Sequence, residues 1–530
     1  MSPAEPVGTF CLVLHSHLPW LAHHGAWPVG EEWLYQAWAG SYLPVLDLLR
    51  RLGEDGHRDV LTLGMTPVLA AQLDDPYCLR AMHDWLGGWL LRAHGLAGAA
   101  HDSGGAFGSF GRRDSPALAA LAANEHRRAT AALADFEAHW RHGGSAVLRP
   151  LVDAGVIELL GGPATHPFQP LLEPRVRELA LRTGLADTGR RLGSRPAGIW
   201  APECGYAPGM EDGYARAGVA RFLVDGPALH GETAFAHTVG DTDVVCFGRD
   251  LPVTYRVWSP KSGYPGHRDY RDFHTYDHTS GIKPARVTGR SVPPERKKPY
   301  DAALAAEAVR RHAADFVTVV RSRLVELAAQ HGRPALVVAA YDTELFGHWW
   351  FEGPQWLATV LRELPAAGVR VTTLRGALDA GLLAGPVELP ASSWGSGKDW
   401  RVWDGALVAD LVDLGRDVQR RLVSTVDSSG RGLGRDAVLD GLARQALLAL
   451  SSDWAFMVSK GSAADYARAR AARHAGHVVE ITELLRAGER EKAARVVADY
   501  DARDGVFGQL DAWQLRRPDD RTACCMPTGR

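Results

Sequence analysis

Two carboxylic acids, Glu203 and Asp342, each follow a short apolar run and lie among aromatic and glycine residues. Glu203 is in the sequence GIWAPECGY, and Asp342 is in the sequence AYDTELFGHWW. The carboxyl ends of the strands form the active face of an α/β barrel, so acids at these points are candidates for catalysis. Two such acids beside tryptophans suggest cleavage of a glycosidic bond, in which one attacks the sugar and the other handles the leaving-group proton.

The two acids differ in their surroundings, and this difference suggests different roles. Pro202 fixes the approach to Glu203, and Gly205 lets a ligand come near the backbone, which suits a rigidly held nucleophile. Asp342 follows a clear buried strand and has aromatic neighbours, which would raise its pKa as a general acid requires. Glu344 competes for this second role, but Asp342 is nearer the end of the strand.

Three histidines follow predicted strands: His15 and His17 after the first, and His166 after the third. A His-x-His pair can hold zinc in barrel hydrolases, so a metal-dependent deacylase or amidohydrolase is an alternative interpretation. However, a glutamate follows the fourth strand, and no later residue has the spacing of a further ligand. We therefore expect no metal and no cofactor, and we expect the histidines to bind sugar hydroxyls.

The elements that must position these residues are short, unalternating apolar runs, as expected of parallel strands buried on both faces. The predicted strands are residues 9–14, 60–63, 156–160, 198–200, 221–224, 335–340 and 369–373. Helical stretches separate them, and polar groups follow nearly every strand, which favours a barrel over a doubly wound sheet. The sequence therefore predicts an α/β fold with a catalytic barrel in residues 1–385.

Three further segments are predicted around the barrel. Residues 75–150 are expected to be a helical insertion, and residues 259–300, rich in aromatic residues, Gly and Pro, a substrate loop. Residues 386–515 contain amphipathic patterns without strand signals, which predicts an all-helical C-terminal domain. Residues 516–530 are expected to be a disordered tail.

The composition limits the classes of partner. The chain has a net charge of −3, so nucleic acid and anionic membranes are poor partners and neutral, hydroxyl-rich ligands fit better. No apolar stretch approaches the ~18 residues of a membrane span, no secretory signal is visible, and six cysteines make no disulfide framework. We expect a cytoplasmic protein. The 17 tryptophans exceed what a core needs, and an indole suits stacking on a partly wet ligand.

Five motifs resemble those of glycoside hydrolase family 57, particularly its 1,4-α-glucan branching enzymes. They are HSHLP (residues 15–19), GGPATH (161–166), WAPEC (200–204), YDTELFGHWW (341–350), and SWG (393–395) with VW (402–403). The resemblance implies an incomplete (β/α)7 barrel with a helical insertion and an all-helical C-terminal domain. It also implies that Glu203 is the nucleophile and Asp342 the acid/base of a retaining reaction, with the carboxyl groups about 5–5.5 Å apart.

The expected substrate is an α-1,4-linked glucan, cleaved at Glu203 and transferred to a 6-hydroxyl to form an α-1,6 branch of a glycogen-type polysaccharide. His15 and His166 match substrate-site histidines of the family, and Trp394 and Trp403 match tryptophans that the helical domain contributes to the glucan groove. The full set of candidate substrate-binding residues is His15, His17, Trp33, His166, Arg256, Tyr341, Trp394, Trp403 and Asp453.

One departure concerns the choice between transfer and hydrolysis. Branching members of the family carry a tyrosine in a loop after the fifth strand, but residues 227–243 contain none, and Phe235 and His230 are the nearest substitutes. A retaining α-amylase-type hydrolase or a 4-α-glucanotransferase is therefore the alternative within the family. A non-catalytic glucan-binding module is a further alternative, and it predicts that Glu203→Gln keeps both affinity and turnover.

Overall fold

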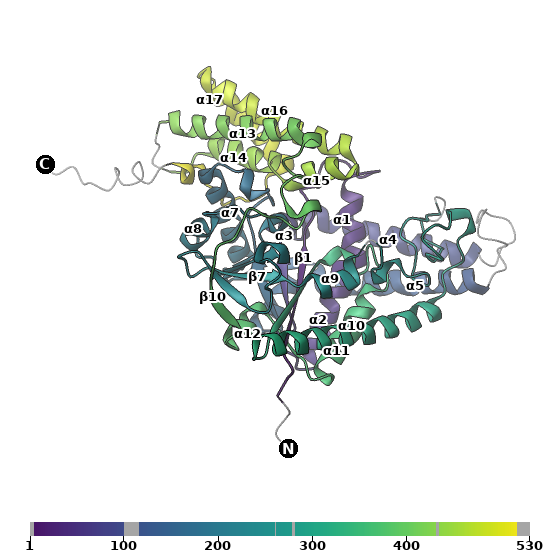
Figure 1. Cartoon of the computed structure of the whole chain (residues 1–530). Coiled ribbons are helices and arrows are strands. Elements are labelled where there is room, and N and C mark those ends of the chain that lie inside the picture. The colour runs from purple at the N-terminus through teal and green to yellow at the C-terminus, as the bar shows by residue number, and fades with distance from the viewer. Residues whose placement is uncertain (1–4, 100–115, 260, 278–280, 431–433, 517–530) are drawn as a thin grey trace.

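A curved sheet lies at the centre of the protein (Figure 1). The computed structural model describes residues 5–99, 116–259, 261–277, 281–430 and 434–516. In these residues the strands are β1 (Thr9–Ser16), β2 (Leu61–Met65), β3 (Ile157–Gly161), β4 (Gly198–Ile199), β5 (Arg221–Asp225), β6 (Ala236–Val239), β7 (Val245–Arg249), β8 (Leu336–Asp342), β9 (Arg370–Thr372) and β10 (Leu383–Val387).

The strand order is β10-β6-β7-β5-β4-β3-β2-β1-β8, and the path from β7 to β8 is parallel throughout. The two ends of this path approach each other, because the Asp250 amide after β7 donates to the Val338 carbonyl of β8 at 2.8 Å. Every residue of β1 is buried, which explains its continuous apolar run. The incomplete (β/α)7 barrel is confirmed.

The identity of the seventh barrel strand differs from the prediction. Residues 369–373 contain β9, a short strand that pairs with the first residues of β1 and lies outside the β7-to-β8 path. The missed strand is β7, which forms a hairpin with β6 through a connection rich in Gly, Asp and Thr. That connection interrupts the apolar pattern and made the segment resemble a loop. Asp342 consequently ends the seventh parallel strand of the path rather than the sixth.

Helices surround the sheet and extend from it (Figure 1). In the N-terminal part they are α1 (Glu31–Ala37), α2 (Leu43–Glu54), α3 (Pro67–Asp74), α4 (Pro76–Ala99), α5 (Pro116–Asp135), α6 (Gly144–Asp153), α7 (Pro174–Leu192), α8 (Met210–Arg216), α9 (Leu251–Trp258), α10 (Ala302–His331), α11 (Gly353–Ala366) and α12 (Leu374–Asp379). Helices α4 and α5 pack together as an arm that projects from the body.

The C-terminal part is helical and lies over the end of the sheet at which β1 finishes (Figure 1). Its helices are α13 (Ala409–Ser428), α14 (Ala437–Ala449), α15 (Ser452–Lys460), α16 (Ala464–Arg486) and α17 (Arg490–Asp504). The Asp436 side chain caps α14 by accepting from the amides of Val438 and Leu439. This arrangement brings the first turn of α15 to the carboxyl ends of the barrel strands.

The proposed domain boundaries, 1–385 and 386–515 with the insertion at 75–150, stay predictions. Part of the insertion (residues 100–115) and residues 517–530 of the predicted tail lie outside the described residues. None of the described helices is long and apolar enough to cross a membrane.

Candidate active site

Glu203 is held at a strained point of the backbone. It follows β4 in a short 3-10 turn (Pro202–Cys204), with φ at 62° in the left-handed region. Non-glycine residues in this region cost on the order of 1–3 kcal/mol and cluster at functional sites. The Trp394 amide donates to the Glu203 carbonyl at 2.9 Å, which joins this turn to the segment before the C-terminal helices.

The Glu203 carboxylate receives one hydrogen bond on each oxygen. Trp394 Nε1 donates to Oε2 at 2.8 Å, and Ser452 Oγ donates to Oε1 at 2.9 Å. The side chain is buried, and this burial raises its pKa to about 7, although the two hydrogen bonds favour the ionised form. The carboxylate is thus fixed in orientation and loses its proton near neutral pH.

Asp342 has a different environment. It is the last residue of β8 and lies in register with His15 of the neighbouring β1. Among the described residues, no hydrogen bond to its carboxyl group is found, so the group is free for a ligand. Burial raises its pKa well above the usual value, with further increases from the negative charges of Glu344 and Glu203 and an opposing effect of Arg249. A raised pKa favours the protonated form, which a general acid needs.

Glu344 occupies a supporting position. It accepts hydrogen bonds from the Tyr42 hydroxyl at 2.5 Å and from the His17 amide at 3.0 Å. Burial raises its pKa to about 7. Because Tyr42 and the backbone already engage its carboxyl group, Glu344 is less accessible to a substrate than Asp342.

Three histidines form a stack beside Glu203, whose Oε1 lies 4.0 Å from His166 Nδ1. His17 lies over His166 with ring centroids 3.7 Å apart, and His15 Nε2 is 3.1 Å from His166 Nε2. His15 also stacks on Trp200 at 4.3 Å. Burial lowers the pKa of both His15 and His166 well below the usual value, so both are neutral and each can offer a donor or an acceptor.

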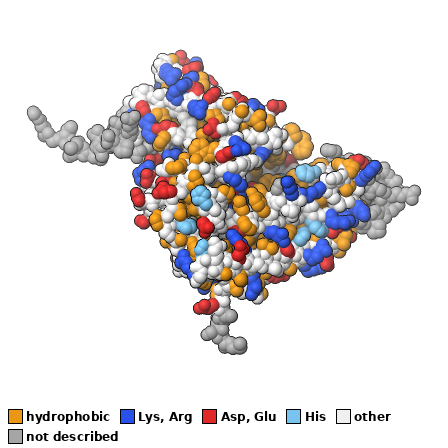
Figure 2. Space-filling view, viewed as in Figure 1, with side chains coloured by type: hydrophobic (Ala, Val, Ile, Leu, Met, Phe, Trp, Pro, Cys, Tyr) orange, Lys and Arg blue, Asp and Glu red, His pale blue; other side chains and the backbone are white. Residues whose placement is uncertain are grey.

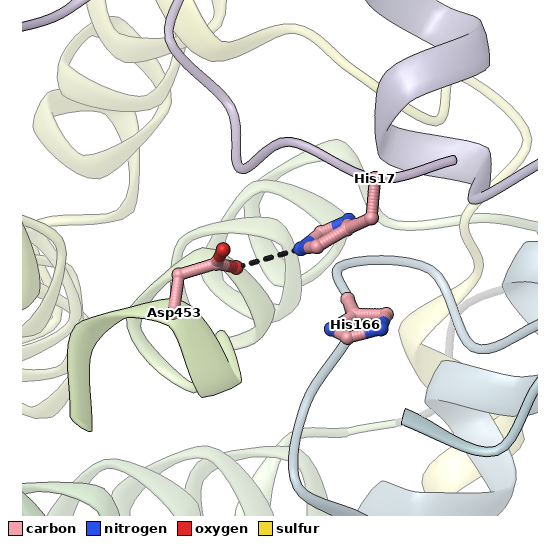
Figure 3. Close-up of side chains that lie close together, drawn as sticks. All are labelled: His17, His166 and Asp453. Carbon is pink, nitrogen blue, oxygen red and sulfur yellow. Dashed lines mark hydrogen bonds and ion pairs between the residues drawn. The ribbon is translucent and has the colours of Figure 1, made fainter. Parts of the chain in front are cut away.

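His17 is the member of the stack that contacts an acidic side chain. Its Nε2 lies 2.9 Å from Asp453 on α15 (Figure 3), and its Nδ1 lies 3.1 Å from Thr66 Oγ1. Burial alone would lower its pKa, but the charge and hydrogen bond of Asp453, with the charges of Glu203 and Glu344, outweigh this effect and the pKa is raised. The pair links the end of β1 to the C-terminal helices.

The same cluster bears on the metal alternative. Ligand atoms of His17, His166 and Asp453 lie within 4.8 Å of one another, so the group could hold an ion (Figure 3). However, both nitrogens of His166 already have partners, Ser452 Oγ at 2.9 Å and His15 Nε2. A bound metal would have to displace one of them.

The sequence did not single out Ser452, which bridges Glu203 and His166. Its only signal was its place beside Asp453 at the start of a helical pattern. Arg249 and Trp258 were also missed. Arg249 lies 5.3 Å over the Trp394 ring, and Trp258, at the start of the predicted substrate loop, approaches the rings of Tyr341 and Trp394.

Several predicted substrate residues lie away from the two acids. The Arg256 guanidinium is half exposed and pairs with Asp315 at 2.7 Å. Trp403 is buried with 1% exposure, and its ring stacks on Phe168 at 4.7 Å, so it supports the groove wall instead of presenting a face. Trp33 packs partly buried near Tyr466 of α16.

Two further residues are less accessible to a substrate than the sequence suggested. Tyr341 is buried beside Asp342, and its hydroxyl has no partner among the described residues. Phe235, one of the two substitutes for the missing tyrosine, is buried under Arg333, whose guanidinium carbon lies 3.7 Å from the ring centroid. Phe235 is therefore a core residue. His230 is exposed and stays the candidate.

The chain matches the sequence profile of glycosyl hydrolase family 57 over residues 11–379 and that of "1,4-alpha-glucan branching enzyme, C-terminal" over residues 416–514. It is 59% identical to a probable 1,4-alpha-glucan branching enzyme of Mycobacterium tuberculosis, across 97% of this chain and 99% of that protein.

Two solved structures are similar over nearly their whole length. The GH57-type branching enzyme of Pyrococcus horikoshii superposes with a TM-score of 0.87 at 29% identity, covering 97% of each chain. An α-amylase of Thermotoga maritima superposes with a TM-score of 0.84 at 25% identity, covering 96% of this chain and 99% of that one. The shared architecture therefore includes the helical C-terminal part as well as the barrel.

Proposed function

The chain belongs to glycosyl hydrolase family 57, within its 1,4-α-glucan branching enzymes, and from this premise we propose how its site cleaves and transfers an α-1,4-glucan. Glu203 acts as nucleophile and Asp342 as acid/base. The observation that carries this assignment is the difference between the two acids. Glu203 is fixed by Trp394 and Ser452, whereas Asp342 has no hydrogen bond to the described residues and a pKa raised well above its usual value.

In the first step, Glu203 attacks the anomeric carbon while Asp342 protonates the departing glycosidic oxygen. The electron pair of the broken bond stays with the leaving chain, and a glucosyl ester forms on Glu203. Trp394 and Ser452 hold the carboxylate in place, so attack requires little reorganisation. The neutral His15 and His166 are the proposed partners of sugar hydroxyls, which each ring can bind by giving up one of its present hydrogen bonds.

In the second step, the 6-hydroxyl of another chain attacks the ester while Asp342 takes its proton. Asp342 changes from acid to base because the charge on Glu203 differs between the two steps. The negative charge of Glu203 raises the pKa of Asp342, and esterification removes that charge. The pKa of Asp342 therefore falls when the intermediate forms, so its carboxyl group stays ionised and can accept the proton of the acceptor hydroxyl.

Transfer also requires that water compete poorly with the sugar acceptor. Trp394, which bonds to Glu203, lies among indole rings: its ring centroid is 4.9 Å from that of Trp200 and 6.4 Å from that of Trp258. These rings supply apolar cover in a chain that has no tyrosine in residues 227–243. Within that segment, the exposed His230 is the remaining candidate for excluding water. The physiological substrate we propose is a glycogen-type glucan, and the cytoplasmic location stays a prediction.

The proposal is tested by incubating the protein with amylose, debranching the product enzymatically, and measuring the lengths of the released chains. We expect new α-1,6 linkages with little increase in reducing ends. Release of reducing ends without new branches would mean that water is the acceptor and would favour the amylase-type alternative. Transfer to new α-1,4 linkages alone would favour the 4-α-glucanotransferase.

A further inference from the structure

A second hollow lies beside the active site, where the α4–α5 arm meets the body. It has a volume of about 810 Å³ and is open to solvent. Residues 347–349, which follow Asp342 closely in the chain, line it together with residues of α1 and with residues 271–273, 276 and 281–283. The His348 amide donates to Ser41 Oγ at 3.1 Å, which ties this wall to the turn that carries Glu344. On the face seen in Figure 2, hydrophobic and basic side chains gather at this junction.

Aromatic rings make up much of the lining. They are Trp85, Trp89, Phe273, Tyr276 and Trp349. Trp85 and Trp89 are four residues apart on α4, so both lie on the same side of that helix. Trp85 Nε1 donates to the Glu32 carboxylate at 2.9 Å, which fixes the ring, and the Trp349 side chain is 41% exposed. Exposed indole faces with a polar edge suit the apolar faces of sugar rings.

The charged groups of the hollow largely neutralise one another. Arg271 bonds to Glu125 at 2.7 Å, and Arg128 lies 3.6 Å from the same carboxylate. Asp272 pairs with Lys297 at 2.6 Å. Arg271 and Arg128 thus share one acidic partner, which leaves Arg92 and Lys283 as the other basic side chains of the lining.

Two nitrogen-bearing side chains face the hollow without a hydrogen-bond partner in the described part of the chain. Lys283 Nζ lies 3.6 Å from the centroid of the Phe273 ring, and the His348 ring meets the same ring edge-on at 5.5 Å. Burial lowers the pKa of Lys283 to about 7 and that of His348 to about 3. Both are thus suited to hydrogen bonding with a neutral ligand.

We propose that this hollow is a second α-glucan binding site, which holds a strand of the polysaccharide outside the catalytic groove. The ligand class rests on the proposed function. A chain bound at both places raises the effective concentration of glucan at Asp342 and Glu203. The site favours long polymers over short oligosaccharides, because only a long chain reaches both positions.

The test uses Trp349→Ala and Lys283→Met in the full-length protein. Trp349 is exposed, so its truncation leaves no cavity in the core, and methionine keeps the stem of Lys283 over Phe273. Leu91→Ala is the matched control, because Leu91 is 73% exposed on the same arm and does not line the hollow. Affinity electrophoresis in gels containing amylopectin measures binding, with each variant also carrying Glu203→Gln to stop turnover.

We expect Trp349→Ala to weaken binding of amylopectin by about three- to tenfold, the effect of losing one aromatic contact. In the active background the KM for amylose rises by a similar factor, while the kcat and the rate on maltoheptaose stay unchanged. Lys283→Met also weakens amylopectin binding and raises the KM for amylose, and Leu91→Ala changes neither quantity.

Unchanged binding and unchanged KM in both pocket variants would overturn the inference, as would a fall in kcat without weaker binding. The gel assay measures binding and does not depend on catalysis. If the wild type makes no branches but Trp349→Ala still binds amylopectin more weakly, the second site stands and the proposed function fails. If the wild type branches amylose and the variants bind amylopectin like the wild type, the proposed function stands and the second site fails.

Discussion

Replacing Ser452 with alanine tests the idea that the C-terminal part activates the nucleophile. Ser452 Oγ lies 2.9 Å from Glu203 Oε1 and 2.9 Å from His166 Nδ1, and its side chain is buried. Alanine removes both hydrogen bonds and almost no volume. The effect therefore reports on the hydrogen bonds and not on repacking.

The magnitude follows from the charge on Glu203. A hydrogen bond to an ionised group contributes about 1.5–3 kcal/mol, so its loss lowers kcat/KM by about 10- to 100-fold. The pH profile also changes. Glu203 must be ionised to attack, its pKa is about 7, and the bond from Ser452 lowers that pKa. Without this bond the pKa rises, so the acidic limb of the profile moves to higher pH.

The assay is the initial rate of branching on amylose between about pH 5 and pH 9. Ser459→Ala is the control, because Ser459 is on the same helix and bonds to the Val402 carbonyl, away from Glu203. We expect the control to match the wild type in both rate and profile. An Ser452→Ala variant with less than a twofold change in kcat/KM and an unmoved acidic limb would refute the role given to this serine.

Three further predictions follow from the site. Asp342→Asn lowers turnover by about 10²- to 10⁴-fold and leaves amylopectin binding in gels intact, because it removes only the proton-transferring group; unchanged turnover would shift the role to Glu344. Asp453→Asn lowers the midpoint of thermal unfolding by several degrees, and more at about pH 5.5 than at about pH 9. The sign follows because His17 has a raised pKa, so its charge stabilises the fold below the unfolded pKa and this stabilisation is lost as pH rises through the folded value. An equal fall in the midpoint of thermal unfolding at both pH values would contradict this prediction. Treatment with EDTA leaves the branching rate unchanged, because both nitrogens of His166 are engaged by protein groups; loss of activity restored by zinc would support the metal alternative instead.

Much of the barrel could be predicted because buried parallel strands leave continuous apolar runs. β1 and β8 are the clearest examples, since nearly all their residues are buried. β7 could not be predicted in the same way, because it follows a polar hairpin connection. Its position depends on tertiary pairing with β5, which no local pattern records.

The candidate site likewise contains residues that the sequence pattern indicates and residues that it does not. Glu203 and Asp342 could be singled out because each follows a strand and lies in a motif. Ser452 could not, since it meets Glu203 across 249 positions of sequence and serine is common at the start of helices. Trp403 shows the opposite difficulty: its motif is visible, but whether an indole faces a groove or packs on Phe168 depends on the fold.

The central claim is that Glu203 carries the glucan between donor and acceptor, and a trapped intermediate tests it most directly. The Asp342→Asn variant is incubated with an activated, slowly turned-over α-glucosyl fluoride, digested with protease, and analysed by mass spectrometry. The account predicts one glucosyl group on the peptide that contains Glu203, and none in a variant that also carries Glu203→Gln. A glucosyl group on Glu344 or on any other residue would contradict it.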